Sequence, residues 1–189
     1  MKPKTANPGP SEYDFALIVG GVQVLDERAE NALFESGCED ATLSMQYGRL
    51  YIEFSRGAAS LKDAVLSAIR DVRRAGLGAE VLRVDECNLV TAAEIARRIG
   101  RTRQAVSQYI SGVRGPGGFP PPECHIAESA PLWAWCAVSF WLSQNSFIRE
   151  EDCWNAEVVE AVNRELEAAR QRRRQPQLVA EIVRELARK

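Results

Sequence analysis

The chain has 189 residues, of which 46% are hydrophobic, so it is long and apolar enough to form one large domain or two small ones with packed cores. No run approaches the ~20 apolar residues of a transmembrane helix, so we expect no membrane partner. The net charge of −2 excludes a uniformly basic nucleic-acid-binding protein, and any such surface must be local.

The N-terminal half predicts a short tail followed by a mixed α/β domain. Residues 1–12 lack the apolar stretch of a signal peptide, and we expect a disordered tail and a cytoplasmic protein. Strand and helix signals then alternate in the order β-α-β-β-α-β, which predicts a ferredoxin-like domain over 13–87. The predicted strands cover 13–21, two segments within 41–57 joined at Tyr47–Gly48, and 79–86, and the predicted helices cover 25–37 and 60–76.

Residues 91–112, TAAEIARRIGRTRQAVSQYISG, predict a helix-turn-helix. Thr91 and Glu94 have the spacing of a capping box at the start of the first helix. Gly100 suits the turn, because glycine tolerates positive φ. Thr102 is then placed to cap the second helix. The alternative is an ordinary αα-hairpin with a solvated polar face.

The second helix of this segment has an apolar side and a polar side. Val106 and Ile110, four residues apart, are expected to face inward. Arginine and glutamine near the start of a helix suit base edges in a major groove, where they read guanine and adenine. The outward positions are Arg103, Gln104, Ser107 and Gln108.

Charge along the chain supports the same segment. Residues 91–115 carry five basic side chains and one acidic, whereas residues 1–90 carry 10 basic and 14 acidic. In residues 116–147, the only Asp, Glu, Lys or Arg side chains are Glu123 and Glu128. The compact positive region therefore coincides with the predicted helix-turn-helix, as expected when one module makes the phosphate contacts.

The segment after the helix-turn-helix predicts a wing. Residues 113–122, VRGPGGFPPP, are a connection in which the prolines favour extended backbone. A short strand is predicted over 131–135, PLWAW, and a short helix over 137–142, AVSFWL. We expect the three tryptophans between 133 and 141 to pack beneath the wing rather than to stack on bases. Helix, turn, helix, hairpin and helix together outline a winged helix-turn-helix over 88–143.

The residues IARRIGRTRQAVSQYISG, GFPPP and PLWAWCAVSFWL resemble the excisionase and prophage-regulator proteins of the MerR-like and AlpA-like type. The region also resembles DNA-binding proteins of actinobacteria in which an N-terminal α/β domain precedes this module. The resemblance implies double-stranded DNA as partner, with the second helix in the major groove and the wing against the adjacent minor groove or backbone. It implies base contacts by Arg103, Gln104, Ser107 and Gln108, and phosphate contacts by Arg101 and Arg114. We expect Arg103 and the helix N-termini to contact phosphates as well, and we include Thr102 among the DNA-binding residues. Two features depart from the pattern: Arg101 occupies a usually apolar turn position, and the wing tip over 123–130 has no lysine or arginine.

Residues 144–189 predict two amphipathic helices, over 148–174 and 177–188. Their apolar stripes serve packing within the chain or between copies, and homodimerisation stays open. The run Arg172–Arg174 is read as a solvated helix end, with a second DNA contact as the alternative. The predicted stripe residues are Trp154, Val158, Ala161, Val162, Leu166 and Ala169 in the first helix, and Leu178, Val179, Ile182, Val183 and Leu186 in the second.

No motif predicts catalysis, a metal or a cofactor. The five cysteines are scattered without a CxxC pair, which indicates reduced thiols. A zinc site built from Cys124, His125, Cys136 and Cys153 would match no usual ligand spacing.

The fold class we predict is α+β, and the function is that of a bacterial transcriptional regulator that binds double-stranded DNA sequence-specifically. Two alternatives remain. One is an antitoxin-type or adaptor-type module that binds a protein partner through its N-terminal sheet or C-terminal helices and DNA only secondarily. The other is an excisionase-like architectural factor.

Overall fold

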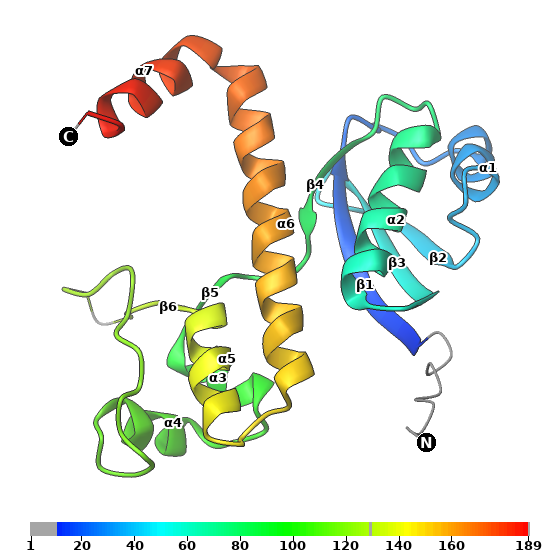
Figure 1. The fold of residues 1–189 in the computed structure, drawn as a ribbon. Coiled ribbons are helices and arrows are strands. Elements are labelled where there is room, and N and C mark those ends of the chain that lie inside the picture. Colours follow the sequence, from blue (N-terminus) through cyan, green and yellow to red (C-terminus); the bar gives the residue numbers. More distant parts are fainter. Residues whose placement is uncertain (1–10, 129, 189) are drawn as a thin grey trace, which may run out of the picture. The chain divides into compact units, whose positions relative to one another are not determined.

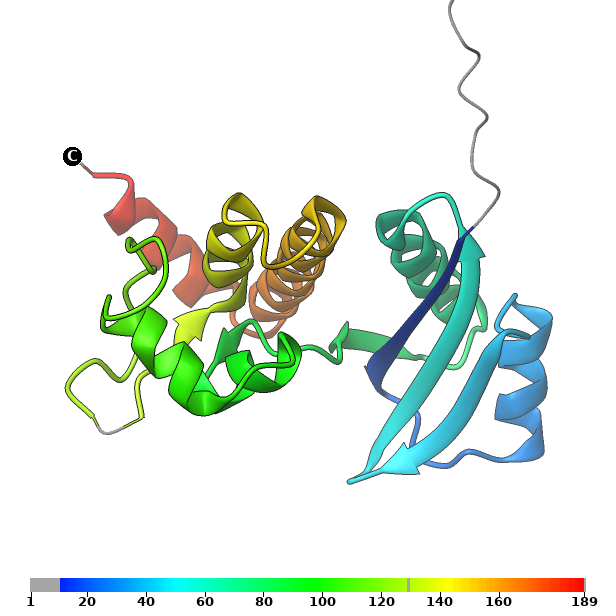
Figure 2. The ribbon, with the colours of Figure 1, turned by 90° about the horizontal axis from the view of Figure 1, so that it is seen from below.

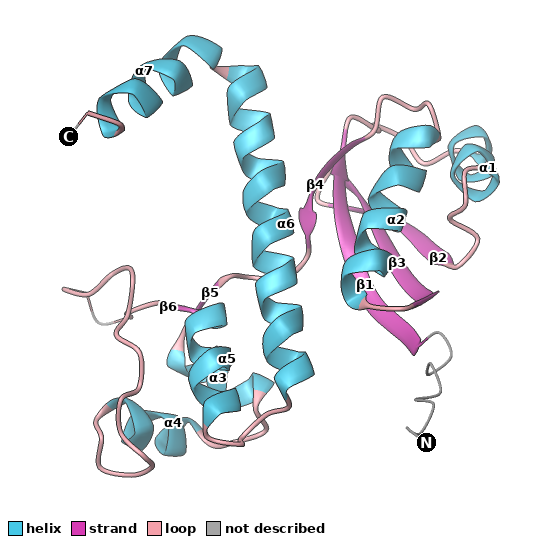
Figure 3. Ribbon diagram, viewed as in Figure 1, coloured by secondary structure: helices cyan, strands magenta, loops and turns pink. Residues whose placement is uncertain are grey.

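The fold is α+β, and the computed structural model describes residues 11–128 and 130–188 (Figure 1). Within that range it contains seven helices, a four-stranded antiparallel sheet and a two-stranded sheet (Figure 3). Most of the predicted tail lies outside the described residues, but Ser11 and Glu12 already belong to the first strand.

The chain divides into two compact units, each described here by itself. The N-terminal unit holds the chain up to Asp85 together with the part from Ala161 onward, and the central unit holds Glu86–Glu160. No helix among the described residues has both the length and the apolar character needed to cross a bilayer.

The N-terminal unit contains the strands and helices that the sequence predicted, with boundaries shifted by a few residues. The sheet order is β2-β3-β1-β4, and every neighbouring pair is antiparallel. Tyr47 and Gly48 form the two-residue turn between the hairpin strands, with φ of 49° and 73°, as a tight hairpin requires. The elements are β1 (Ser11–Gly20), α1 (Glu27–Glu35), β2 (Ala41–Gln46), β3 (Arg49–Ala58), α2 (Leu61–Arg74) and β4 (Glu80–Val84).

One face of this sheet is apolar and is covered by α2. The α2 helix begins at Ser60, whose hydroxyl accepts the Asp63 N–H at 3.1 Å, as the sequence predicted. Alternation along β3 places every second side chain on the covered face. The buried side chains of this core include Leu17 and Val19 from β1, Leu50, Ile52 and Phe54 from β3, and Ala64, Val65, Ala68, Ile69 and Val72 from α2.

A buried arginine continues the alternation of β3 on the same face. Arg56 is 7% exposed, and its guanidinium lies 4.7 Å from the centre of the Phe54 ring. Its donors are used in hydrogen bonds to both Asp40 carboxylate oxygens (2.7 and 2.8 Å), the Asp71 carboxylate (2.8 Å), the Ser67 hydroxyl (3.1 Å) and the Gly37 carbonyl (2.6 Å). These partners raise the Arg56 pKa further, so the residue is a permanent cation that joins β3, α2 and the loop after α1.

The edge strand β4 is covered by the second part of α6 (Glu150–Arg174) (Figure 1). Asn163 of α6 is buried, and its side-chain carbonyl accepts the Val84 N–H at 2.8 Å while its amide donates to the Val84 carbonyl at 3.2 Å. One amide side chain therefore takes the place of a neighbouring strand at this position of the edge.

The C-terminal helix α7 (Pro176–Leu186) is amphipathic, as predicted, but its apolar face is uncovered in the described chain. Four of its large apolar side chains are exposed: Leu178 is 49%, Ile182 46%, Val183 61% and Leu186 81% exposed. In the stripe predicted for α6, Trp154 is 59% exposed and Ala161 is also exposed, so these two positions do not pack within the described chain.

The central unit is built around two short helices and a small sheet. The predicted strand over 131–135 is shorter than expected, because the backbone turns helical at Trp135. The strand β6 pairs with β5, which precedes α3 and was not predicted. Among the described residues of the predicted wing, Cys124 and Leu132 form an isolated β-bridge. The elements are β5 (Leu89–Val90), α3 (Ala92–Arg98), α4 (Arg103–Ile110), β6 (Trp133–Ala134), α5 (Trp135–Gln144) and the first part of α6.

The core of the central unit joins α3, α4 and α5. Ile95, Val106, Val138 and Leu142 are fully buried within it. Trp133 and Trp141 are also buried there, as predicted, while Trp135 is partly exposed and packs against the same cluster.

Candidate nucleic-acid interface

The turn between α3 and α4 has the caps that the sequence predicted. Thr102 accepts the Ala105 N–H at 3.2 Å and so starts α4. Gly100 has φ of 62°, and the following N–H, of Arg101, donates to the Ala96 carbonyl at 2.9 Å. This geometry ends α3 within one turn and places the N-terminus of α4 at the surface.

The capping box at α3 is only half formed. Thr91 accepts the Glu94 N–H at 3.2 Å, as predicted, but the Glu94 carboxylate bonds to Arg97 (2.6 Å) and Arg98 (3.0 Å). These two guanidinium groups lower the Glu94 pKa to about 2. Arg98 also pairs with Glu86 at 2.8 Å and lies 4.7 Å from the centre of the Trp135 ring. Both arginines of α3 are therefore neutralised by carboxylates.

The six arginines of the central unit fall into two groups. Arg97, Arg98 and Arg149 are held in ion pairs by nearby carboxylates. The other three are exposed and form no ion pair with any residue that the structure describes: Arg101, Arg103 and Arg114. Arg103 begins α4, while Arg101 precedes the helix and Arg114 follows it. The cationic groups open to a ligand therefore gather around the helix that was expected to read DNA.

The predicted base-reading positions are mostly at the surface. Figure 2 shows α4 on the near side of the central unit. Arg103, Gln104 and Ser107 are exposed, but Gln108 is half-buried at the edge of this face. The Ser107 hydroxyl donates to the Arg103 carbonyl at 3.0 Å, which leaves its lone pairs free to accept a hydrogen bond. Ser111, at the C-terminal cap, is exposed and was not predicted as a site residue.

The loop that carries Arg114 is tied down by hydrogen bonds. The Arg114 N–H donates to the Gln108 carbonyl at 3.1 Å, after a turn in which Gly112 has φ of 71°. Further along, the indole N–H of Trp141 donates to Gly117 O at 2.9 Å, and that of Trp133 to Pro120 O at 3.1 Å. The buried tryptophans therefore fix the path of the predicted connection over 113–122.

The wing tip supplies no cation, as its sequence indicated. His125 has φ of 56°, and its Nδ1 lies 2.6 Å from Glu128 Oε2. In the described parts of the chain, no three His, Cys, Asp or Glu side chains gather in a way that would hold a metal ion. Burial and the nearby Glu160 raise the pKa of Cys136 to about 12, so its thiol stays protonated at neutral pH.

Sequence reasoning missed the aromatic residues beside α4. Ile110 was expected to be buried but is only partly so, whereas Tyr109 is 6% exposed. The Tyr109 ring lies 5.4 Å from that of Phe147 and 5.7 Å from that of Trp141. Only the contact between the α5–α6 loop and α4 makes Phe147 part of this region, and no local pattern reports that contact.

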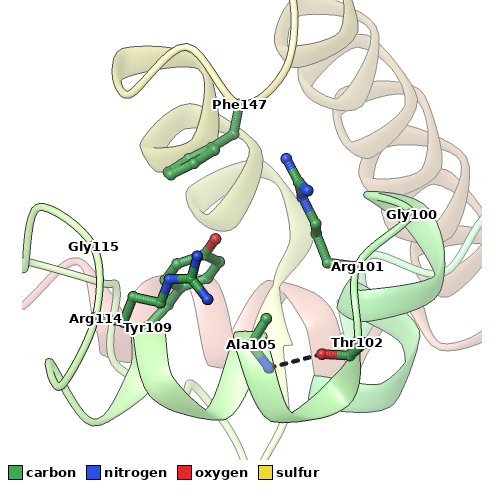
Figure 4. Close-up of a pocket in the computed structure, with 8 residues that line it drawn as sticks. All are labelled: Gly100, Arg101, Thr102, Ala105, Tyr109, Arg114, Gly115 and Phe147. Carbon is green, nitrogen blue, oxygen red and sulfur yellow. Dashed lines mark hydrogen bonds between the residues drawn. The ribbon is translucent and has the colours of Figure 1, made fainter.

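The rings of Tyr109 and Phe147 border a pocket of about 430 Å³ (Figure 4). Two of the three unpaired arginines reach it from opposite ends of α4. Its lining residues are Gly100, Arg101, Thr102, Ala105, Tyr109, Arg114, Gly115 and Phe147.

Comparison with known proteins adds no relative. No protein-family model matches the chain, and neither a curated protein nor a solved structure matches it. The resemblance to MerR-like and AlpA-like proteins therefore stays a prediction from residues 88–143.

Proposed function

We propose that this protein is a bacterial, cytoplasmic transcriptional regulator that binds double-stranded DNA sequence-specifically. In this proposal the central unit is a winged helix-turn-helix and α4 is its reading helix. The observation that carries it is the distribution of ion pairs: the arginines of α3 are neutralised, while Arg101, Arg103 and Arg114 around α4 are not. A cation with no partner in the chain is free to neutralise a phosphate and to release its counterion.

Each predicted site residue has a role that fits its position. Arg101 and Arg114, at the two ends of α4, contact phosphates, and Arg103 contacts a phosphate as well as a base. The N-terminus of α4, which Thr102 caps, adds its free N–H groups and positive dipole end. Arg103 and Gln104 lie in the first turn of α4, where side chains reach base edges when a helix enters the major groove. Ser107 continues that face, and Gln108 contributes from its edge.

The N-terminal unit is proposed to be ferredoxin-like. The strand order β2-β3-β1-β4, with all neighbours antiparallel, supports this topology. Its role in regulation is assembly or effector binding, because it contributes no residue to the reading face.

A second candidate function is an adaptor or antitoxin-type module that binds a protein partner. The exposed apolar face of α7 favours it, since Leu178, Ile182 and Leu186 lie along one side of this helix and are 49%, 46% and 81% exposed. Stoichiometric co-purification of one protein, lost in a Leu178→Glu/Ile182→Glu variant, would favour this candidate.

The main proposal is tested by selecting duplexes from a random pool and measuring binding by fluorescence anisotropy. The wild type should bind the selected duplex at least ~10³-fold more tightly than a random one. Each of Gln104→Ala and Gln108→Ala should cost ~1–3 kcal/mol on the selected duplex and little on random DNA. The matched control is Gln144→Ala, an exposed glutamine at the end of α5, which should change neither affinity. Equal losses on both duplexes for the Gln104 and Gln108 variants would contradict base reading.

A further inference from the structure

The pocket beside α4 has the size and lining of a small-ligand site. Its volume of about 430 Å³ falls within the range of clefts that hold small molecules. Phe147, which is 38% exposed, and Tyr109 supply flat apolar walls. A Cβ at Gly115 would lie 3.0 Å from the Tyr109 ring, and Gly115 has φ of 90°, so this wall depends on a glycine.

Two guanidinium groups give the pocket its charge. Figure 4 shows the Arg101 and Arg114 side chains extending from opposite ends of α4 toward the space beside Phe147. Neither forms an ion pair with a described residue, and no acidic side chain lines the pocket. Guanidinium groups bind phosphate through paired, charge-assisted hydrogen bonds, and their planes also pack on aromatic rings.

The pocket and the reading positions lie on different sides of α4. The pocket is lined by Ala105 and Tyr109, which are one helical turn apart. Gln104 and Ser107 project from the exposed side instead. A duplex lying against the reading side would therefore leave the space between α4 and Phe147 unfilled, although the long side chains of Arg101 and Arg114 can serve either location.

We propose that this pocket binds a small phosphate ester with a flat apolar body, and that the bound ester competes with DNA for Arg101 and Arg114. The phosphate lies between the two guanidinium groups and the body packs on Phe147 and Tyr109. The competition rests on the proposed function, but the binding of the ester does not. Because binding linkage is reciprocal, bound DNA should lower the affinity for the ester by the same factor as the bound ester lowers the affinity for DNA.

The probe is phenyl phosphate, titrated into the full-length protein by calorimetry in a phosphate-free buffer. We expect saturable binding, and binding of inorganic phosphate that is weaker because it lacks the ring. The double variant Arg101→Gln/Arg114→Gln should bind phenyl phosphate at least ~10-fold more weakly than the wild type. Phe147→Ala should lower the affinity for phenyl phosphate but not the affinity for inorganic phosphate. Arg103→Gln is the matched control, because Arg103 is also exposed and without an ion pair among the described residues but does not line the pocket. It should leave the affinity for phenyl phosphate unchanged.

Three results would overturn the proposed ester site: no saturable binding of phenyl phosphate to the wild type, unchanged binding to the double variant, or an equal loss of affinity in Arg103→Gln. Circular dichroism and urea unfolding of each variant separate these results from misfolding. A competition arm then adds phenyl phosphate to a protein–duplex complex, where displacement supports the competition and its absence contradicts it. If the ester binds but no duplex does, the proposed DNA-binding function is wrong and the proposed ester site is supported. If a duplex binds but the ester does not, the ester site is wrong and the DNA-binding function is supported.

Discussion

The two units use arginine in opposite ways. In the N-terminal unit, Arg56 is buried, and its donors are taken by two carboxylates, a hydroxyl and a backbone carbonyl. In the central unit, Arg101, Arg103 and Arg114 are exposed and have no ion pair in the described chain. The first arrangement satisfies the cation within the fold, whereas the second leaves its cations available to something outside it.

This difference shows that a count of basic residues does not locate a binding surface. Arg97 and Arg98 belong to the same positive segment as Arg101 and Arg103, yet Glu94 and Glu86 neutralise them. The informative quantity is the number of guanidinium groups that remain after the internal pairs are formed. By that measure the interface narrows from five arginines between 91 and 115 to three.

Among the arginines compared, we expect the buried Arg56 to contribute most to the free energy of unfolding. Arg56→Met should lower the free energy of unfolding by about 2–3 kcal/mol, because Asp40 loses its ion pair and the partly buried Asp71 keeps only the exposed Arg74 as a partner. Arg49→Met, at an exposed position of the same strand, should change it by less than about 0.5 kcal/mol. Urea denaturation measures both, and equal effects would show that Arg56 is not the structural cation described here.

A second prediction concerns Asn163, another buried polar side chain of the N-terminal unit. Asn163→Leu should destabilise the protein by about 1–3 kcal/mol, because the Val84 N–H and carbonyl lose their partner at the sheet edge. Hydrogen exchange should show the Val84 amide losing protection, while the amides of α4 stay unchanged. Loss of protection in α4 instead would mean that the substitution does not act at the edge strand.

A third prediction concerns the cap of α4, which should matter more for stability than the exposed arginines around that helix. Thr102→Ala should cost about 1 kcal/mol, because α4 loses the acceptor for the Ala105 N–H. Thr102→Ser keeps the hydroxyl and should restore most of that stability. If the serine and alanine variants were equally unstable in urea, the cap would not be the cause.

The smallest stability effect is expected for Glu94, and it depends on pH. Its pKa of about 2 lies below its ordinary value, so its contribution is present above about pH 4.5 and disappears as pH falls toward 2. Because Glu94 is partly solvated, the contribution should stay below about 1 kcal/mol, and Glu94→Gln should remove it at neutral pH. The same variant releases Arg97, so its affinity for random duplex should rise at low salt. A variant that binds random duplex no better than the wild type would contradict the neutralising role of Glu94.

Local sequence signals predicted the elements of this protein well, because their causes are local. The caps at Ser60, Thr91 and Thr102 and the Tyr47–Gly48 turn each depend on residues within four positions. What the sequence missed depends on long-range contact. Burial of Arg56 needs carboxylates from two other segments, and the pairing of β5 with β6 joins residues about forty positions apart.

The candidate site divides in the same way. Its exposed residues were predicted from helical periodicity, except that Gln108 is half-buried. The neutralisation of Arg97 and Arg98 and the aromatic wall formed by Tyr109 and Phe147 were not predicted. Both require knowing which side chains meet after folding.

The salt dependence of duplex binding tests the central claim most directly. The logarithm of the binding constant should be measured against the logarithm of salt concentration for the wild type and for four single Arg→Gln variants. Replacing Arg101, Arg103 or Arg114 should each reduce the slope by about 0.9, because each phosphate contact releases its counterion. Arg97→Gln should leave the slope unchanged, because Glu94 already neutralises that charge. An equal reduction for Arg97→Gln, or no reduction for the other three, would contradict the account.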